Sequence, residues 1–239
     1  MKEILIITAS LLVLCGCQND NKPVVTNGEN TVVSSSVNTK DSKSPLYLDN
    51  KVYIIPEDKQ KKSYSAKDFE GFYIEYMKMY GKDLEALNFD ISEVTPEEVK
   101  KEIGCQIFRL NGEYSTYVVN NSKVFTIGFG FGGFGITSIK TCDFDRDGQR
   151  DLIYTYSWGS GLHRSNIGIL NFSTNKQEEL DFMLLNKDSV LEKISDTEFK
   201  VYSADVSPKG KRDNELTRKE LVADIKVNDK RAEVTKYNK

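Results

Sequence analysis

Apolar side chains recur at helical spacing between residues 65 and 81. They follow the i, i+3, i+4 spacing of one buried helix face, at Phe69, Phe72, Tyr73, Tyr76, Met77 and Tyr80. Ser65 stands at the N-cap position, Asp68 follows three residues later, and Gly81 comes after the last apolar residue. The pattern predicts an amphipathic helix whose aromatic face packs into a core. An aromatic ligand groove on that face is the alternative.

A second, shorter helix is predicted from its end signals. Thr95 is expected at the N-cap, Pro96 at the first helical position, and Glu98 where it would close a capping box. Gly104 follows as the expected stop signal.

From Cys105 onward the apolar residues alternate with polar ones or form short runs, which is the pattern of β-strands. Turn signals such as Asn111-Gly112 and Asn120-Asn121 separate them. A short strand is also expected within Lys51–Ile55. The later strands are predicted at Cys105 to Leu110, Tyr114 to Asn120, Lys123 to Phe129, Ile136 to Cys142, Leu152 to Trp158, Ile167 to Phe172, Val190 to Ile194, Phe199 to Ala204, Leu221 to Val227 and Ala232 to Tyr237. Helices followed by strands predict an α+β fold.

The N-terminal part of the chain has a different pattern. Lys2 precedes an apolar run, Ile4 to Leu14, of about eleven residues, which is too short to span a bilayer and has the length of a secretory signal core. The segment Gln18 to Ser44 is rich in Asn, Thr, Ser and Lys without a sustained period, so it cannot bury enough apolar surface to fold. We interpret it as a tether.

Overall composition is that of an ordinary globular protein. The 239 residues are 38% hydrophobic and 10% aromatic. The formal net charge of −3 argues against a nucleic-acid partner.

The segment Leu14-Cys15-Gly16-Cys17 resembles the lipobox of bacterial lipoproteins, in which Leu, a tolerant position and a small residue precede the Cys. The resemblance implies cleavage before Cys17, a diacylglyceryl thioether on Cys17 and often a third acyl chain. Two acyl chains hold a protein stably on a membrane. We therefore expect a signal peptide at 1–16, a tether at 17–44, a single α+β domain at 45–239, and a location on the outer face of a bacterial cell membrane.

Two of the four cysteines, Cys105 and Cys142, lie in the folded part of the chain. Outside the cytoplasm an even pair can form a disulfide, and two buried thiols are the alternative.

The segment 143–151 carries the clearest chemistry. It reads D-x-D-x-D-G-x-x-D, with carboxylates at Asp143, Asp145, Asp147 and Asp151. Alternate residues of a tightly turning loop point toward one centre, and Ca²⁺ takes six to eight oxygen ligands. Without a cation, these carboxylates would repel one another. A polar turn that binds no ion is the alternative.

Two further residues of this loop are expected to contribute through the backbone. Gly148 allows the sharp turn that lets the Gln149 carbonyl face the ion. The expected metal site is therefore Asp143, Asp145, Asp147, Gln149 and Asp151, with Ca²⁺ as the cofactor and Asp151 acting directly or through water.

The loop is not that of an EF-hand, because Tyr154 stands where the bidentate Glu would be and strand patterns flank it. It resembles the calcium hairpin of FG-GAP and VCBS repeats, in which Phe-Gly precedes the loop and Asp-Leu opens the next strand. Phe134-Gly135 and Asp151-Leu152 stand in nearly those places, whereas the Gly-Ala-Pro of the repeat is absent. The resemblance covers about 25 residues and implies one blade-like hairpin.

A β-propeller needs four or more blades, and no second D-x-D-x-D-G segment occurs in the sequence. We therefore expect two N-terminal helices packed on a mainly antiparallel, blade-like β-sheet that is not a complete β-propeller.

The segment 157–165 is a glycine-flexed loop with the only Trp and the only His of the chain. Trp158, His163 and Arg164 are candidates for a binding surface, since such side chains on a loop over a rigid sheet form contacts. A structural loop is the alternative. Ser160 and His163 raise the idea of a hydrolase, but no G-x-S-x-G surrounds the serine.

These observations predict a non-catalytic, membrane-anchored lipoprotein that holds Ca²⁺ structurally and binds a cell-envelope polymer or protein. The alternative is an extracytoplasmic hydrolase whose active site the sequence does not identify.

Overall fold

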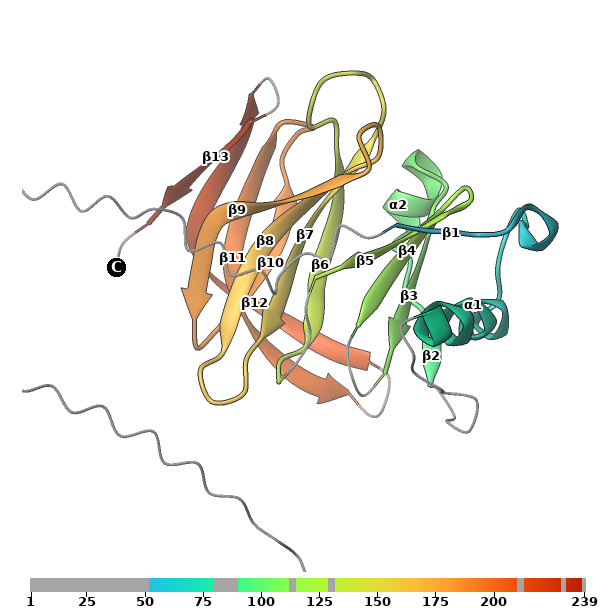
Figure 1. Cartoon of the computed structure of the whole chain (residues 1–239). Coiled ribbons are helices and arrows are strands. Elements are labelled where there is room, and N and C mark those ends of the chain that lie inside the picture. The colour runs from blue at the N-terminus through green and yellow to red at the C-terminus, as the bar shows by residue number, and fades with distance from the viewer. Residues whose placement is uncertain are drawn as a thin grey trace, which may run out of the picture. The chain divides into compact units, whose positions relative to one another are not determined.

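A computed structural model of the chain describes residues 52–79, 90–111, 115–128, 132–209, 213–228 and 231–237 (Figure 1). They belong to a compact unit, Lys43–Lys239. The expected signal peptide, the expected tether and Cys17 lie outside the described residues.

The described residues form two α-helices, a short 3-10 helix and thirteen strands. The helices are α1 (Ala66–Met79) and α2 (Glu97–Glu102), and the 3-10 turn is Glu57–Lys59. The strands are β1 (Val52–Ile54), β2 (Ile91–Glu93), β3 (Gln106–Leu110), β4 (Thr116–Asn120), β5 (Lys123–Ile127), β6 (Gly135–Cys142), β7 (Asp151–Trp158), β8 (Arg164–Asn171), β9 (Lys176–Leu185), β10 (Asp188–Lys193), β11 (Glu198–Lys209), β12 (Asp213–Asn228) and β13 (Arg231–Lys236).

The strands form three antiparallel sheets, which we name A, B and C. Sheet A has the order β1-β5-β4-β3-β2, sheet B the order β6-β7-β8-β9, and sheet C the order β10-β11-β12-β13. In sheets B and C each strand pairs with the next one along the chain, as in the four-stranded blade of a propeller. The register of sheet B pairs Cys142 with Asp151, which places the loop 143–150 at the β6–β7 turn.

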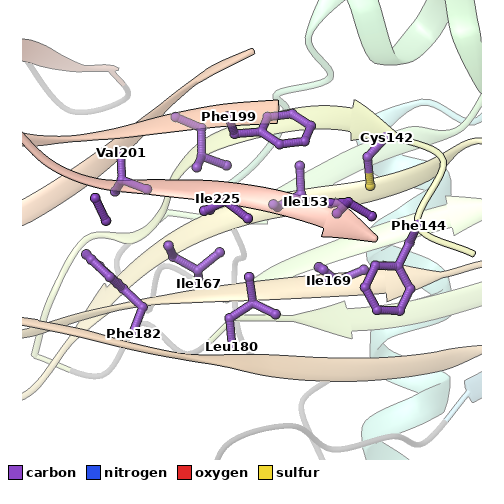
Figure 2. Close-up of a cluster of buried hydrophobic side chains, with 13 residues drawn as sticks. Cys142, Phe144, Ile153, Ile167, Ile169, Leu180, Phe182, Phe199, Val201 and Ile225 are labelled. Atoms are coloured by element: carbon purple, nitrogen blue, oxygen red, sulfur yellow. The ribbon is translucent and has the colours of Figure 1, made fainter. Parts of the chain in front are cut away.

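Figure 1 shows the sheets as successive layers. Three buried clusters hold these layers together. One joins α1 to sheet A and includes Phe69 and Phe108, whose rings stack with centroids 4.7 Å apart. A second lies between sheets A and B. The third lies between sheets B and C, where Figure 2 shows Phe199, Val201 and Ile225 close to Ile153, Ile167, Ile169 and other residues of the cluster.

The expected α+β class is wrong, because the described residues form a mainly β fold. Three sheets replace the single expected sheet, and α1 is the only described helix longer than two turns. Strands β1 and β2 also precede α1 and α2 respectively, so the helices do not form an N-terminal layer of their own. The physical reason is that sheet B is apolar on both faces and therefore requires a sheet on each side.

The first predicted helix is confirmed together with its N-terminal cap, whereas Tyr80 and the predicted stop signal Gly81 lie outside the described residues. Ser65 N–H donates to Asp68 Oδ2 (2.9 Å), and Asp68 N–H donates to Ser65 Oγ (3.2 Å), which is a reciprocal capping box. Lys61 adds an ion pair to Asp68.

The second helix is present, but its predicted capping box is wrong. Thr95 Oγ accepts a hydrogen bond from Ile107 N–H (2.9 Å) instead of capping the helix. Glu98 accepts hydrogen bonds from Lys140 and Thr141 on β6. Both side chains therefore form tertiary contacts in place of the predicted cap, Thr95 with sheet A and Glu98 with sheet B. Gly104 does follow the helix, with a φ of 77°.

Strand prediction failed mainly at β2 and β9, which were not predicted, and at β12, whose start was predicted too late. Strand β9 is an edge strand whose first residues, Lys176 to Glu179, are polar and give no strand pattern. Strand β12 begins at Asp213, eight residues before the predicted start, because its charged first half pairs with β11 in a long hairpin.

Among the described residues, no helix combines the length and apolar character needed to cross a membrane.

Candidate metal centre

The candidate metal loop, residues 143–150, connects β6 to β7 at one end of sheet B. Its second residue, Phe144, is 6% exposed and packs in the cluster between sheets B and C (Figure 2). Because this side chain anchors the loop to the core, the backbone positions of the neighbouring aspartates are defined.

Asp143, Asp145 and Asp147 form a group that could hold a metal ion. One carboxylate oxygen from each lies within 4.8 Å of the others. Alternate loop residues thus converge on one point, as the spacing predicts.

Two residues of the loop have a positive φ, and these backbone conformations let the three aspartates converge. Arg146 has a φ of 55° and Gly148 a φ of 85°. Gln149 N–H donates to Asp147 Oδ1 (2.7 Å), while the Gln149 side chain is exposed. Gln149 therefore contacts the aspartate group through its backbone.

Asp151 lies beneath the loop and is 1% exposed. Its carboxylate accepts backbone N–H bonds from Phe144 (3.1 Å) and Phe172 (2.9 Å). The pKa of Asp151 is raised to about 6, mainly by burial and to a smaller degree by the charges of Asp145 and Asp147, against the lowering effect of the two N–H bonds. Asp151 is therefore placed to brace the loop, and its carboxylate is not one of the three that converge.

Asn171 and Ser173 are parts of the site that sequence reasoning missed. Asn171 is the last residue of β8 and Ser173 lies in the β8–β9 turn. Both hydrogen bond to Asp145 Oδ2, with distances of 3.0 Å from Asn171 Nδ2 and 3.2 Å from Ser173 Oγ. The one signal in the sequence is the polar Asn171 at the end of the apolar run Ile167–Phe172. A polar residue in such a run, buried as Asn171 is, needs partners.

The donor set fits a hard cation. Asp143 Oδ1 is buried and has no hydrogen-bond partner among the described residues. A buried carboxylate oxygen without a partner is costly unless a cation satisfies it. The three converging residues offer only carboxylate oxygen, which suits Ca²⁺, Mg²⁺ or Mn²⁺ rather than zinc or copper.

Arg150 links the loop to the other layers. Its guanidinium pairs with Asp196 in the β10–β11 turn (2.8 Å) and with Glu102 at the end of α2 (3.7 Å). Lys193 joins the same network, with its ammonium 2.8 Å from Thr141 Oγ and 3.0 Å from an Asp196 oxygen. The metal loop is thus tied to sheet C and to α2.

The candidate binding residues Trp158 and Arg164 lie together on sheet B. The Arg164 guanidinium lies 4.7 Å from the centre of the Trp158 ring, and Trp158 Nε1 donates to Asn166 Oδ1 (2.9 Å). Exposed Leu162, Met183 and Leu185 lie nearby, since Leu185 pairs with Arg164 and Met183 with Asn166. We name Trp158, Leu162, Arg164, Met183 and Leu185 the Trp158 patch.

His163 is turned away from this patch. Its Nε2 lies 2.8 Å from Oδ1 of the buried Asp188, and its ring packs edge-on against Phe134. Ser160 is exposed, and no hydrogen bond joins it to His163 in the described part of the chain. The Ser160–His163 pair of the hydrolase alternative is therefore not assembled.

Cys105 and Cys142 are both free and buried, so the disulfide alternative is wrong. Cys105 lies in the cluster between sheets A and B, and Cys142 in the cluster between sheets B and C. Sheet B separates them. Burial raises the pKa of the Cys105 thiol to about 12 and raises that of Cys142 as well.

Comparison of the chain with protein-family models, with curated proteins and with solved structures gives no match.

Proposed function

We propose that the chain is a non-catalytic lipoprotein module that binds Ca²⁺ at Asp143, Asp145 and Asp147 and uses the ion to stabilise its fold. The convergence of these three carboxylates within 4.8 Å carries the proposal. Asp143 Oδ1, buried without a partner among the described residues, supports it.

Calcium suits this loop better than magnesium does. Ca²⁺ accepts six to eight oxygen ligands in flexible geometry, whereas Mg²⁺ demands a near-ideal octahedron. The loop supplies carboxylates and backbone on a single short turn, which leaves several positions for water. The ion would offset the mutual repulsion of the carboxylates and hold the loop against β8.

The lipobox resemblance at Leu14–Cys17 supports acylation at Cys17 and a location at the outer face of a bacterial membrane. The Trp158 patch is the surface that we propose for contact with an envelope polymer or protein. It combines a Trp, an Arg and exposed apolar side chains, the composition of energetically important interface residues.

Thermal unfolding of the full chain in detergent solution tests the calcium site, with Trp158 fluorescence as the signal. Extracellular calcium modules bind with a Kd of about 10⁻⁴ to 10⁻³ M, so about 5 mM CaCl₂ should stabilise the fold by about 1 to 2 kcal/mol. This corresponds to about 2 to 4 °C in melting temperature for each kcal/mol. Asp145→Asn, which keeps the side-chain shape, should abolish the shift.

Asp181→Asn is the matched control, because Asp181 is an exposed aspartate of β9 that pairs with Lys236. This variant should keep the full response to CaCl₂. If neither CaCl₂ nor EDTA changes the melting temperature of the wild type, the proposed site is contradicted.

A further inference from the structure

The side chain of Asn171 connects the metal loop to the β8–β9 turn. It is 6% exposed. Its Nδ2 donates to Asp145 Oδ2 at 3.0 Å and lies 3.4 Å from Asp151 Oδ2. Its Oδ1 accepts hydrogen bonds from Thr174 N–H (2.8 Å) and from the Thr174 hydroxyl (2.8 Å). The Ser173 hydroxyl lies 2.9 Å from the same oxygen and shares its single hydrogen between Asn171 Oδ1 and Asp145 Oδ2.

These partners fix the orientation of the amide. Carboxylate oxygens face its nitrogen and the Thr174 N–H faces its oxygen, so a flipped amide would lose its bonds to Asp145 and to the Thr174 N–H. The amide is therefore a rigid donor aimed at Asp145. It also places an N–H between Asp145 and Asp151, two carboxylates that repel each other.

The two donors also fix the Asp145 carboxylate. Both Asn171 Nδ2 and Ser173 Oγ approach Oδ2, so this oxygen faces the end of β8 and the turn that follows it, and Oδ1 is the carboxylate oxygen that neither of them contacts. Partners outside the ligand shell orient ligands in this way, and removing them typically weakens metal binding by about 10- to 100-fold.

We propose that Asn171 is a positioning residue of the metal centre, and that it presents Asp145 to the ion from the end of β8, outside the metal loop. Ser173 assists it through the same oxygen. The inference rests on the proposed calcium site and assigns a residue of a second hairpin to that site.

The test is calorimetric titration of the full chain in detergent solution with CaCl₂, in the wild type and three variants. Asn171→Ala should raise the Kd for Ca²⁺ by about 10-fold or more, and Ser173→Ala by a smaller factor. Ser173 is exposed, so its variant keeps the test decisive if Asn171→Ala does not fold.

Asn166→Ala is the matched control. Asn166 lies on the same strand, is 2% exposed, and hydrogen bonds to Trp158, Glu179 and Phe182 at the far end of β8. Its loss should lower stability and leave the Kd within about twofold.

The outcomes separate the two proposals. If the wild type binds Ca²⁺ and both Asn171→Ala and Ser173→Ala bind it equally well, the positioning role is refuted and the calcium site stands. If Asn166→Ala weakens binding as much as Asn171→Ala does, general loss of stability explains the effect and the positioning role is again refuted. A wild type that shows no heat of binding overturns both proposals.

Discussion

Single residues shape the metal loop through backbone conformation as well as through side chains. Gly148 has a φ of 85°, and a Cβ there would meet nothing within 4 Å. The need for glycine at this position therefore comes from the backbone conformation alone, and not from a lack of space for a side chain. Gly71, in α1, is equally open to a Cβ but has helical geometry. The two glycines isolate opposite effects of the same substitution.

Gly148→Ala should lower the free energy of unfolding by about 1 to 2 kcal/mol, because an L-residue is strained in the left-handed region. Gly71→Ala should raise it by about 0.5 to 1 kcal/mol, since alanine favours the helix. Urea denaturation of both variants in EDTA measures the difference without a metal contribution. Equal effects of the two substitutions would refute this explanation of Gly148.

At the scale of elements, α1 depends on the capping box at its start. Its aromatic face packs on sheet A through Phe69, Phe72 and Tyr73. Asp68 is held by Lys61, by the N–H of Ser65 and by the Ser65 hydroxyl. The hydrogen bond from Lys61, followed by those from Ser65, lowers the pKa of Asp68 from 3.8 to about 2. The folded state therefore favours the charged form of Asp68.

This lowered pKa predicts how acid affects the cap. Stability from Asp68 is fully present above the pKa of the unfolded chain, 3.8, and is lost as pH falls through about 2. The stability difference between the wild type and Asp68→Asn should therefore be largest near neutral pH and shrink as pH approaches 2. Urea denaturation between about pH 6 and pH 2 measures it. A constant difference across this range would refute the role of the Asp68 charge.

At the scale of the whole molecule, sheet B is the central layer, and both neighbouring sheets pack against it. Leu152 and Tyr154 of β7 face sheet A, and Ile153 faces sheet C. The metal loop and the Trp158 patch lie at opposite ends of β7, because the loop precedes Asp151 and the patch includes Trp158. An ion at one end and a partner at the other would share one rigid strand.

The proposed anchor and the proposed contact surface can be tested separately in the full chain. Cys17→Ala should leave the uncleaved, signal-bearing precursor and end the incorporation of labelled palmitate, because it removes the acylation site. Trp158→Ala should leave membrane attachment intact and weaken binding to isolated cell envelopes by about 1 to 3 kcal/mol, if the ring is a central contact.

Ile194→Ala is the control for the second variant, because Ile194 is an exposed apolar residue outside the Trp158 patch. Envelope binding by Trp158→Ala at wild-type strength would exclude the patch as the contact surface.

The sequence by itself determined the features that arise within a few residues of chain. The aspartates at 143, 145 and 147 converge because alternate positions of one short turn lie close together in space. Helix α1 was predictable for the same reason, since its apolar face and its cap lie within about four turns. Asn121, at a predicted turn, has the positive φ of 53° that such a turn requires.

Only the tertiary structure decided the features that join distant segments. The polar first residues of β9 form a strand because β8 offers them an edge, and Glu98 leaves its expected cap because Lys140 and Thr141 lie beside it. Cys105 and Cys142 stay apart because sheet B lies between them. Asn171 reaches Asp145 across 26 positions of the sequence. Local spacing therefore specified the candidate metal ligands, whereas the pairing of β7 with β8 within sheet B placed Asn171 beside one of them, because that contact exists only after the two hairpins have paired.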